Sequence, residues 1–300
     1  MRHLISENRN NKYLKPPVPE VFLAGMVFFV TVLIFLLPVS AETFRAEISP
    51  GKISQGDPFV VKVTGLEASS PPSAVLLEKE ILFSGCGDGC YIALGGVDLN
   101  TKPGIYKVTV TAGREKRDLM LSVEKTAFPE IRLTLPKEKV FLSPEDIERT
   151  EREKERLTAI FRTITGKLWD GNFITPLGNS VSTGFGVKRI MNGKNVSVHK
   201  GVDIRGREGE DIRASNAGRV VLVEELFFGG NTVILDHGQG IYTIYMHLSK
   251  ARVDSEDIVS KGDVIGLVGS SGRATGPHLH FAAKLQDMTV NPLSLISLAL

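Results

Sequence analysis

Short runs rich in hydrophobic residues, one of them alternating with polar positions, recur along two long stretches of the chain, and this pattern predicts strands. Between residues 42 and 125, such runs lie at 59–63, 74–77, 105–110 and 119–123, with turn residues between them. Between 168 and 300, glycines punctuate further runs at 218–226, 231–236, 241–248 and 264–268, and no long helical pattern interrupts residues 170–290. The fold is therefore expected to be mainly β, with a small β-sandwich at 42–125 and an all-β domain at 168–300.

A different pattern occupies the linker at residues 126–167. Its first part, 126–142, contains prolines and is expected to be extended. Ser143, Pro144 and Asp146 then have the spacing of a capped helix start, which predicts a helix over 143–163. Dense alternating charge along this helix is typical of a solvated face or a spacer. A helix that binds a protein partner remains an open alternative.

The N-terminal residues 1–41 contain an apolar run at 21–37 that only Gly25 and Thr31 interrupt. Basic residues precede this run, and Val39-Ser40-Ala41 after it fits a cleavage site. Seventeen residues are about the lower limit for spanning a bilayer, so the segment is expected to be a signal peptide or a retained membrane anchor. Both alternatives place the rest of the chain in the periplasm or elsewhere outside the cytoplasm, and an anchor would hold it at the inner membrane.

Charge and cysteine content narrow the function classes. The chain has 36 basic and 34 acidic residues, of which residues 1–41 hold four and two, so the remainder balances at 32 of each. This balance argues against nucleic-acid binding driven by phosphate neutralisation. Cys86 and Cys90 are the two cysteines, and outside the cytoplasm they are expected to form a disulfide, with two free thiols in a turn as the alternative.

Five of the six histidines lie between residues 199 and 280. His199 and Asp203 form an H-x-x-x-D spacing in a segment expected to be extended, so both side chains would share one face. His278 and His280 form an H-x-H spacing, and residues two apart on a strand also share a face. His247 lies at the end of a predicted strand, and His237 lies in the hairpin turn at 237–240.

These spacings are compatible with a metal site. Two imidazoles and one carboxylate that leave a coordination position open form a ligand set found in catalytic zinc centres. Histidine pairs on one strand face also occur as ordinary core or surface residues. The spacing alone leaves both interpretations open.

The stretch from Phe173 to Pro292 resembles the lysostaphin-type (LytM-like) zinc endopeptidases. The matching pieces occur in the family's order over some 120 residues: Thr183-Gly184-Phe185-Gly186, His199-Lys200-Gly201-Val202-Asp203, Ala214 to Val221, Gly230 to Gly238, Tyr245-Met246-His247-Leu248, Lys261 to Gly269 and Thr275 to Phe281. More weakly, the pattern around Pro103-Gly104 and Tyr106 resembles bacterial immunoglobulin-like modules, which implies such a fold for the sandwich.

The resemblance implies one Zn²⁺ per chain, with His199, Asp203 and His280 as ligands. It implies that His247 and His278 are catalytic, one as the base and one as the oxyanion stabiliser, with a zinc-bound water as the nucleophile. Which of the two is the base stays open, and His237 is expected to be structural or merely exposed. The implied activity is hydrolysis of peptide cross-links in peptidoglycan.

The chain departs from the family at two places. The stretch Phe281-Ala282-Ala283-Lys284 lacks a glutamate that many relatives carry, and the usual arginine after Phe-Gly is displaced to Arg189, which is expected to alter substrate contacts. A non-catalytic LytM-like regulator of cell-wall amidases is the main alternative, although such relatives usually lack ligands and all five positions are filled here. A lipoyl or biotinyl carrier is disfavoured, because the hairpin tip has no lysine.

Overall fold

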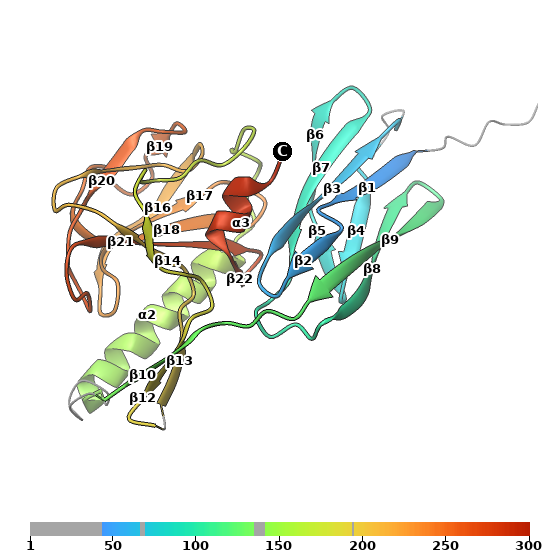
Figure 1. Cartoon of the computed structure of the whole chain (residues 1–300). Coiled ribbons are helices and arrows are strands. Elements are labelled where there is room, and N and C mark those ends of the chain that lie inside the picture. Colours follow the sequence, from blue (N-terminus) through green and yellow to red (C-terminus); the bar gives the residue numbers. More distant parts are fainter. Residues whose placement is uncertain (1–43, 67–69, 135–141, 194) are drawn as a thin grey trace, which may run out of the picture. The chain divides into compact units, whose positions relative to one another are not determined.

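The structure is a computed structural model that describes residues 44–66, 70–134, 142–193 and 195–300 (Figure 1). Strands dominate these residues, and the helices among them are α2 (Pro144–Arg162) and α3 (Pro292–Ser297). The predicted mainly β fold is thus confirmed. None of the helices in the described ranges is long and apolar enough to cross a membrane, and the apolar run at 21–37 lies outside the described residues.

Two sheets form the N-terminal sandwich. The first has the order β1-β3-β7-β6 and the second β2-β9-β8-β4-β5. Their bounds are β1 Arg45–Ser49, β2 Lys52–Ser54, β3 Pro58–Thr64, β4 Ser73–Leu76, β5 Lys79–Ile81, β6 Phe83–Gly87, β7 Cys90–Gly96, β8 Gly104–Ala112 and β9 Glu115–Glu124. Alternate residues face inward, so that Phe59, Val61 and Val63 of β3 share one core with Val108 and Leu121 of the other sheet.

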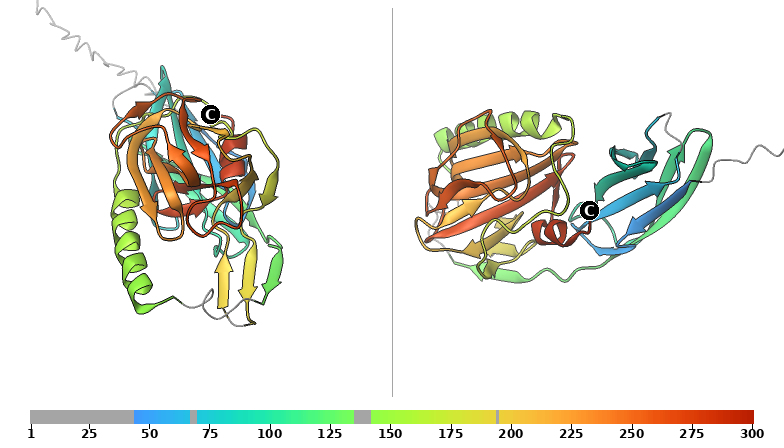
Figure 2. Two further views of the ribbon diagram at one scale, coloured as in Figure 1. Left: turned by 90° about the vertical axis from the view of Figure 1, so that its left-hand side faces the viewer. Right: turned by 90° about the horizontal axis from the view of Figure 1, so that it is seen from above.

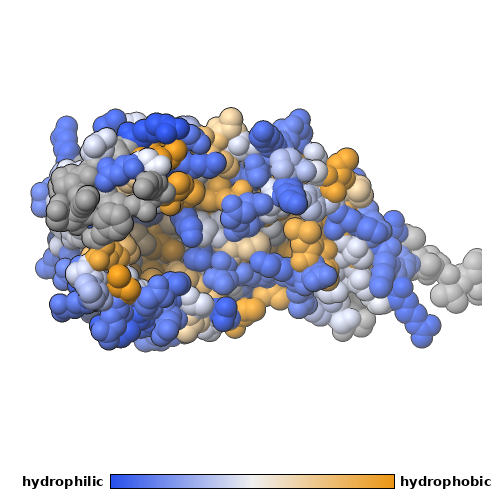
Figure 3. All heavy atoms as spheres, turned by 90° about the horizontal axis from the view of Figure 1, so that it is seen from below, coloured by the Kyte–Doolittle hydropathy of each residue, from blue (hydrophilic) through white to orange (hydrophobic). Residues whose placement is uncertain are grey.

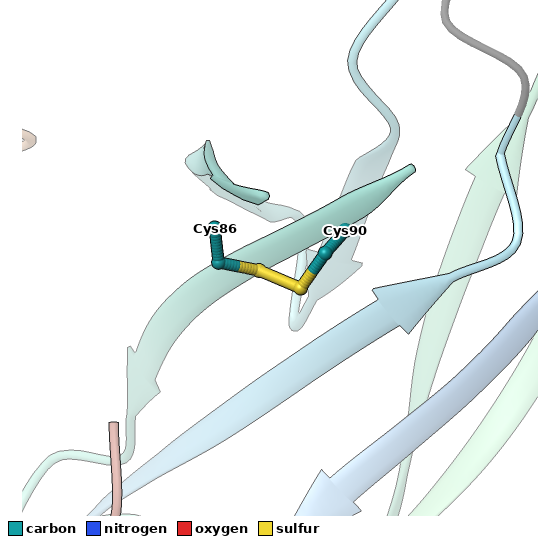
Figure 4. The surroundings of a disulfide bond; sticks show 2 residues. All are labelled: Cys86 and Cys90. Atoms are coloured by element: carbon teal, nitrogen blue, oxygen red, sulfur yellow. A yellow bond between two sulfur atoms is a disulfide. The ribbon is translucent and has the colours of Figure 1, made fainter. Parts of the chain in front are cut away.

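The β6–β7 hairpin carries the disulfide between Cys86 and Cys90 (Figure 4). Cys86 lies in β6, Cys90 begins β7, and Gly87 and Gly89 between them adopt positive φ angles of 132° and 63°. Glycine reaches such angles without steric cost, which allows the chain to close a ring this small. The predicted disulfide is present.

The linker contributes more structure than the sequence pattern predicted. Its extended part includes β10 (Glu130–Leu133), which pairs in parallel with β12 (Lys188–Met191), and β12 pairs in turn with β13 (Asn195–Val198). The expected helix start is confirmed, since the Ser143 hydroxyl accepts a hydrogen bond from Asp146 N at 3.1 Å.

α2 has the expected solvated face and also an apolar face that the charge pattern did not predict. Leu157, Ile160 and Phe161 have the i, i+3, i+4 spacing of an apolar stripe and pack against Ile234 and Tyr242 of the neighbouring sheet. Figures 1 and 2 show α2 lying along that sheet. The charged residues that dominated the pattern occupy the opposite face, where a partner-binding role stays a prediction.

A ten-stranded sheet forms the C-terminal domain, with the order β11-β14-β21-β18-β17-β16-β19 and with β15, β20 and β22 paired alongside. The bounds are β11 Val181–Thr183, β14 Val202–Arg205, β15 Asp211–Arg213, β16 Gly218–Leu226, β17 Gly230–Asp236, β18 Ile241–Ala251, β19 Ile258–Val259, β20 Val264–Val268, β21 His278–Leu285 and β22 Met288–Val290. The hairpin at 237–240 joins β17 to β18 as predicted. The short helix α3 was not predicted in this domain.

Residues from both β domains contribute to a third apolar cluster. Val60, Ile92 and Leu94 of the sandwich lie in it with Trp169 and Leu285 of the C-terminal part. Polar contacts accompany it: Asp57 accepts hydrogen bonds from Asn291 Nδ2 at 3.3 Å and from the Ser294 hydroxyl at 2.7 Å. Within residues 42–300, the chain forms one compact unit.

Candidate metal centre and catalytic histidines

Three side chains converge where β14 pairs with β21 in the large sheet. Asp203 of β14 lies directly opposite His280 of β21 in the antiparallel register, and His199 precedes β14. Asp203 Oδ1 is 2.9 Å from His199 Nε2 and 2.9 Å from His280 Nδ1, and the two histidine nitrogens are 3.0 Å apart. The strand pairing therefore joins residues that are 77 positions apart in sequence.

His199 reaches this cluster in a different way from the one expected. The sequence predicted one extended segment for His199 and Asp203, but β13 ends at Val198 and β14 begins at Val202, with His199 and Gly201 between them. The backbone of His199 bonds to Val187 O and Gly186 N at 2.9 and 2.8 Å, which fixes its position. A Cβ at Gly201 would lie 2.5 Å from Phe281 O and 2.7 Å from His280 Nε2, so only glycine fits there.

The electrostatics of the cluster favour a cation. His199 Nδ1 lies 2.8 Å from Gly184 O and must donate its proton to that carbonyl, which leaves a lone pair on Nε2 of the neutral ring. Burial lowers the pKa of His280 and so favours its neutral form. Burial alone would raise the pKa of Asp203, but the close approach of the His199 and His280 rings outweighs burial and lowers that pKa, so the carboxylate is charged.

Three lone-pair donors thus lie within 3.0 Å of one another, and the ligand atoms of the group all lie within 4.8 Å. Lone pairs at this separation repel unless a proton or a metal ion lies between them. Imidazole nitrogen and carboxylate oxygen are ligands that divalent transition metals and zinc accept. The residues present therefore fit a metal ion.

His247 and His278 lie beside this cluster, with their ring centroids 4.8 Å apart. His278 Nε2 is 3.8 Å from Asp203 Oδ1, and His278 Nδ1 lies 2.8 Å from Gly276 O. His247 Nδ1 lies 2.9 Å from Ser271 O. In both rings the Nδ1 proton is therefore donated to a carbonyl, and Nε2 is the atom left for chemistry.

His247 was expected at the end of its strand, but β18 continues to Ala251, and His247 lies inside it at a register shift in the pairing with β17. Its φ of 67° is unusual for a residue with a side chain, and its N–H donates to Gly229 O at 2.8 Å. Burial lowers the pKa of His247 to about 4, so the ring is neutral near pH 7.

His237 does not join the site. It is fully buried, so of the two expected alternatives the exposed one is wrong. Its Nδ1–H donates to Ala217 O at 2.8 Å, and its Nε2 accepts from the Thr243 hydroxyl at 2.7 Å. Thr243 in turn bonds to the Tyr245 hydroxyl at 2.9 Å, so His237 ends a buried chain of polar groups.

A groove of about 1260 Å³ runs over the five residues. Sequence reasoning missed several of its lining residues, among them Ile131 of β10, Phe228 and Met246. The pair Phe227-Phe228 before two glycines was an available signal, because aromatic side chains in a tight turn between strands are commonly exposed. Ile131 carried no local signal, since it reaches the groove through the β10–β12 pairing.

Comparisons with known proteins agree on one family. A family model described as Peptidase family M23 matches residues 197–292. Two curated relatives are the DD-carboxypeptidase/endopeptidase Mpg of Neisseria meningitidis, 42% identical over 97 residues, and the peptidoglycan DD-endopeptidase ShyA of Vibrio cholerae, 39% identical over 100 residues. These alignments cover 32% and 33% of this chain but only 22% and 23% of the relatives.

One solved structure resembles a much larger part of the chain. A crystal structure of a candidate M23 peptidase from Pseudomonas aeruginosa is 34% identical, with a TM-score of 0.63. The match covers 79% of this chain and 92% of that one. The likeness therefore extends beyond the residues of the metal cluster, and the chain belongs to peptidase family M23, the lysostaphin-type peptidases.

Proposed function

We propose that this protein is a zinc-dependent endopeptidase that hydrolyses peptide cross-links in peptidoglycan. The observation that carries the proposal is the cluster of His199, Asp203 and His280, with the imidazoles of His247 and His278 beside it in one groove. Two curated relatives are named as peptidoglycan or DD-endopeptidases, which supports the substrate class.

His199 Nε2, Asp203 Oδ1 and His280 Nδ1 are the atoms that would hold the zinc ion. Bound zinc supplies Lewis-acid polarisation of the scissile carbonyl and lowers the pKa of a water molecule towards neutrality. The carbonyl of Gly184 keeps the His199 ring in the tautomer that offers Nε2 to the metal.

His247 is assigned as the proton acceptor. Its burial keeps Nε2 unprotonated near neutral pH, and the contacts of its N–H and Nδ1–H with Gly229 O and Ser271 O hold the ring in place. Having accepted a proton, His247 can pass it to the leaving amine. His278, at 4.8 Å between ring centroids, is assigned to donate an Nε2–H hydrogen bond to the substrate oxygen on which negative charge develops. Because its Nδ1–H already donates to Gly276 O, it acts in this role with both ring nitrogens protonated.

The protein is proposed to act outside the cytoplasm. The Cys86–Cys90 disulfide supports an oxidising compartment, where peptidoglycan also lies. The apolar run at 21–37 would serve as the export signal or as an anchor in the membrane.

Digestion of purified peptidoglycan sacculi tests the proposal. The zinc-loaded wild type is expected to bind one zinc per chain and to release muropeptides whose masses identify the bond cut. His199→Ala should lose both zinc and activity, whereas His247→Ala should retain zinc and lose activity. Failure of the wild type to bind zinc or to release products would reject the enzyme in favour of a non-catalytic regulator.

A further inference from the structure

The groove over the metal cluster carries a strong positive charge. Its described lining residues include four cations, and Asp203, the candidate ligand, is their one acid. Beyond residue 41 the whole chain is balanced, with 32 basic and 32 acidic residues. The excess is therefore local to this groove, and it consists of Arg189, Lys200, Arg205 and Arg273, called the groove cations below.

Three groove cations lie on the wall that holds the ligands. Arg205 is two residues from Asp203 on β14 and pairs with His278, so its side chain follows that of Asp203 on the same face of the strand. Lys200 directly follows His199. Arg189 Nη2 lies 3.5 Å from Asp203 Oδ2, the carboxylate oxygen that does not contact the histidines.

Arg273 supplies positive charge from a different segment that lines the groove. It lies in the loop between β20 and β21, where its N–H donates to Phe228 O at 3.1 Å and its guanidinium lies 5.7 Å from the centroid of the Phe228 ring. A peptide that lay in the groove would therefore meet cations from both segments. In the view from below, hydrophilic side chains surround a hollow with apolar patches in its wall (Figure 3).

We propose that the groove cations select peptides that carry carboxylates near the scissile bond, in preference to neutral chains. This inference rests on the proposed endopeptidase function and names the substrate class of the same site. Arginine binds carboxylates through two parallel hydrogen bonds, and like charges gathered in a groove raise the local concentration of an oppositely charged ligand. A neutral peptide would gain neither effect.

A pair of substrates that differ only in charge tests the inference. The first is a soluble cross-linked muropeptide dimer with free carboxylates, and the second is the same dimer with its carboxylates converted to amides. For the zinc-loaded wild type, kcat/KM on the free-carboxylate dimer should exceed that on the amidated dimer by about tenfold or more, if two or more exposed ion pairs form. Most of the difference should lie in KM, and it should shrink as salt concentration rises.

Two groove variants report on the named residues. Arg205→Gln and Arg273→Gln should each lower the ratio of the two kcat/KM values by about threefold, and the double variant should bring the ratio close to one. Lys116→Gln is the matched control, because it removes one positive charge from an exposed position of β9 in the sandwich. Its ratio should equal that of the wild type, and near-ultraviolet circular dichroism checks that each variant is folded.

The outcomes separate the two proposals. Equal cleavage of both dimers by the wild type would overturn the selectivity and leave the endopeptidase function standing. A wild-type preference that survives in the double variant would overturn the assignment to these residues. If the zinc-loaded wild type cut neither dimer, the proposed function would fall and the inference with it.

Discussion

Backbone carbonyls set the chemistry of three histidines at the site. Gly184 O, Ser271 O and Gly276 O each accept the Nδ1 proton of one ring, and each ring therefore offers Nε2. This arrangement orients the imidazoles before any ligand arrives, which spares the entropy of ordering them later. The sequence could not show it, because all three carbonyls belong to loops or bends whose course depends on the folded sheet.

Strand alternation correctly predicted that His278 and His280 share a face. The equivalent argument for His199 and Asp203 named the right neighbours, but the two residues do not share one strand, since three residues outside any strand, 199–201, come before β14. What placed Asp203 was its pairing with His280 across 77 residues. Pairing partners that far apart leave no periodic signal in the chain.

Gly201→Ala should disrupt the metal cluster. The added Cβ would come within 2.5 Å of Phe281 O and 2.7 Å of His280 Nε2, and the carbonyl cannot move without displacing β21. Zinc affinity, measured by competition with a chelator, should fall by about tenfold or more. Gly178→Ala is the control, because nothing lies within 4 Å of its added Cβ. Equal affinity in the two variants would contradict this account.

His237 should make stability depend on pH. Burial lowers its pKa to about 4 in the folded state, against about 6.5 in the unfolded chain. The stability that the buried neutral ring contributes is complete above pH 6.5. It is lost as the pH falls towards 4, because only the unfolded state then binds the proton. Between pH 7 and 4.5, the free energy of unfolding of the wild type should decrease by roughly 2–3 kcal/mol more than that of His237→Gln.

Urea unfolding at the two pH values measures this difference. His237→Gln is expected to be less stable than the wild type at pH 7, since glutamine cannot bridge Ala217 O and Thr243 in the same way. The informative quantity is the change between pH values, in which other titrating groups cancel. Identical changes in both proteins would show that His237 is not buried in its neutral form.

Among the elements, α2 and β10 show what the sequence pattern could not predict. The capping residues correctly predicted where α2 begins. The dense charge did not predict the apolar stripe that packs against the sheet. β10 is four residues long, and its role depends on a parallel partner, β12, that follows more than fifty residues later. Whether so short a segment forms a strand depends more on its neighbouring strands than on its own sequence.

α2 should also support the catalytic groove through Glu153. The carboxylate of Glu153 accepts the Phe227 N–H at 3.0 and 3.1 Å and pairs with Arg149 at 2.9 Å. Phe227 begins the turn in which Phe228 lines the groove and Gly229 O holds the N–H of His247. Glu153 would therefore position His247 from outside the matched family region at 197–292.

Glu153→Ala should lower kcat by about tenfold through displacement of His247, while one zinc per chain is retained. Glu155→Ala, on the exposed face of the same helix, is the matched control and should keep the wild-type kcat. Steady-state kinetics with metal analysis provides the measurement. A loss of melting temperature without any loss of kcat would make Glu153 structural only.

At the scale of the whole molecule, the sequence predicted the mainly β class but not the contacts between the two β domains. Val60, Ile92 and Leu94 look like ordinary sandwich residues in the sequence, yet they share a cluster with Trp169 and Leu285. On strands with both faces covered, alternation no longer tells the inner face from the outer one. A pattern that assumes one solvated face per strand therefore could not predict the contact between the two β domains.

These contacts predict that residues 42–300 unfold as one unit, and the chain's single tryptophan can report it. Trp169 is 3% exposed and lies in the shared cluster, so its fluorescence follows that cluster, whereas far-ultraviolet circular dichroism follows all the strands. In guanidinium, the two signals should have the same midpoint. Asp57→Ala removes the acceptor for Asn291 and Ser294. It should lower the free energy of unfolding by about 2 kcal/mol and move both midpoints together to lower guanidinium concentration.

Asp118→Ala is the control for this substitution, because Asp118 pairs with Lys107 and Thr109 on the exposed face of the sandwich. Exposed pairs of this kind contribute little to stability, so its midpoints should stay near those of the wild type. If the tryptophan signal of Asp57→Ala moved to lower denaturant while its circular dichroism kept a second, later transition, the sandwich and the peptidase domain would be independent. A common shift would instead make the sandwich part of what keeps the catalytic sheet folded.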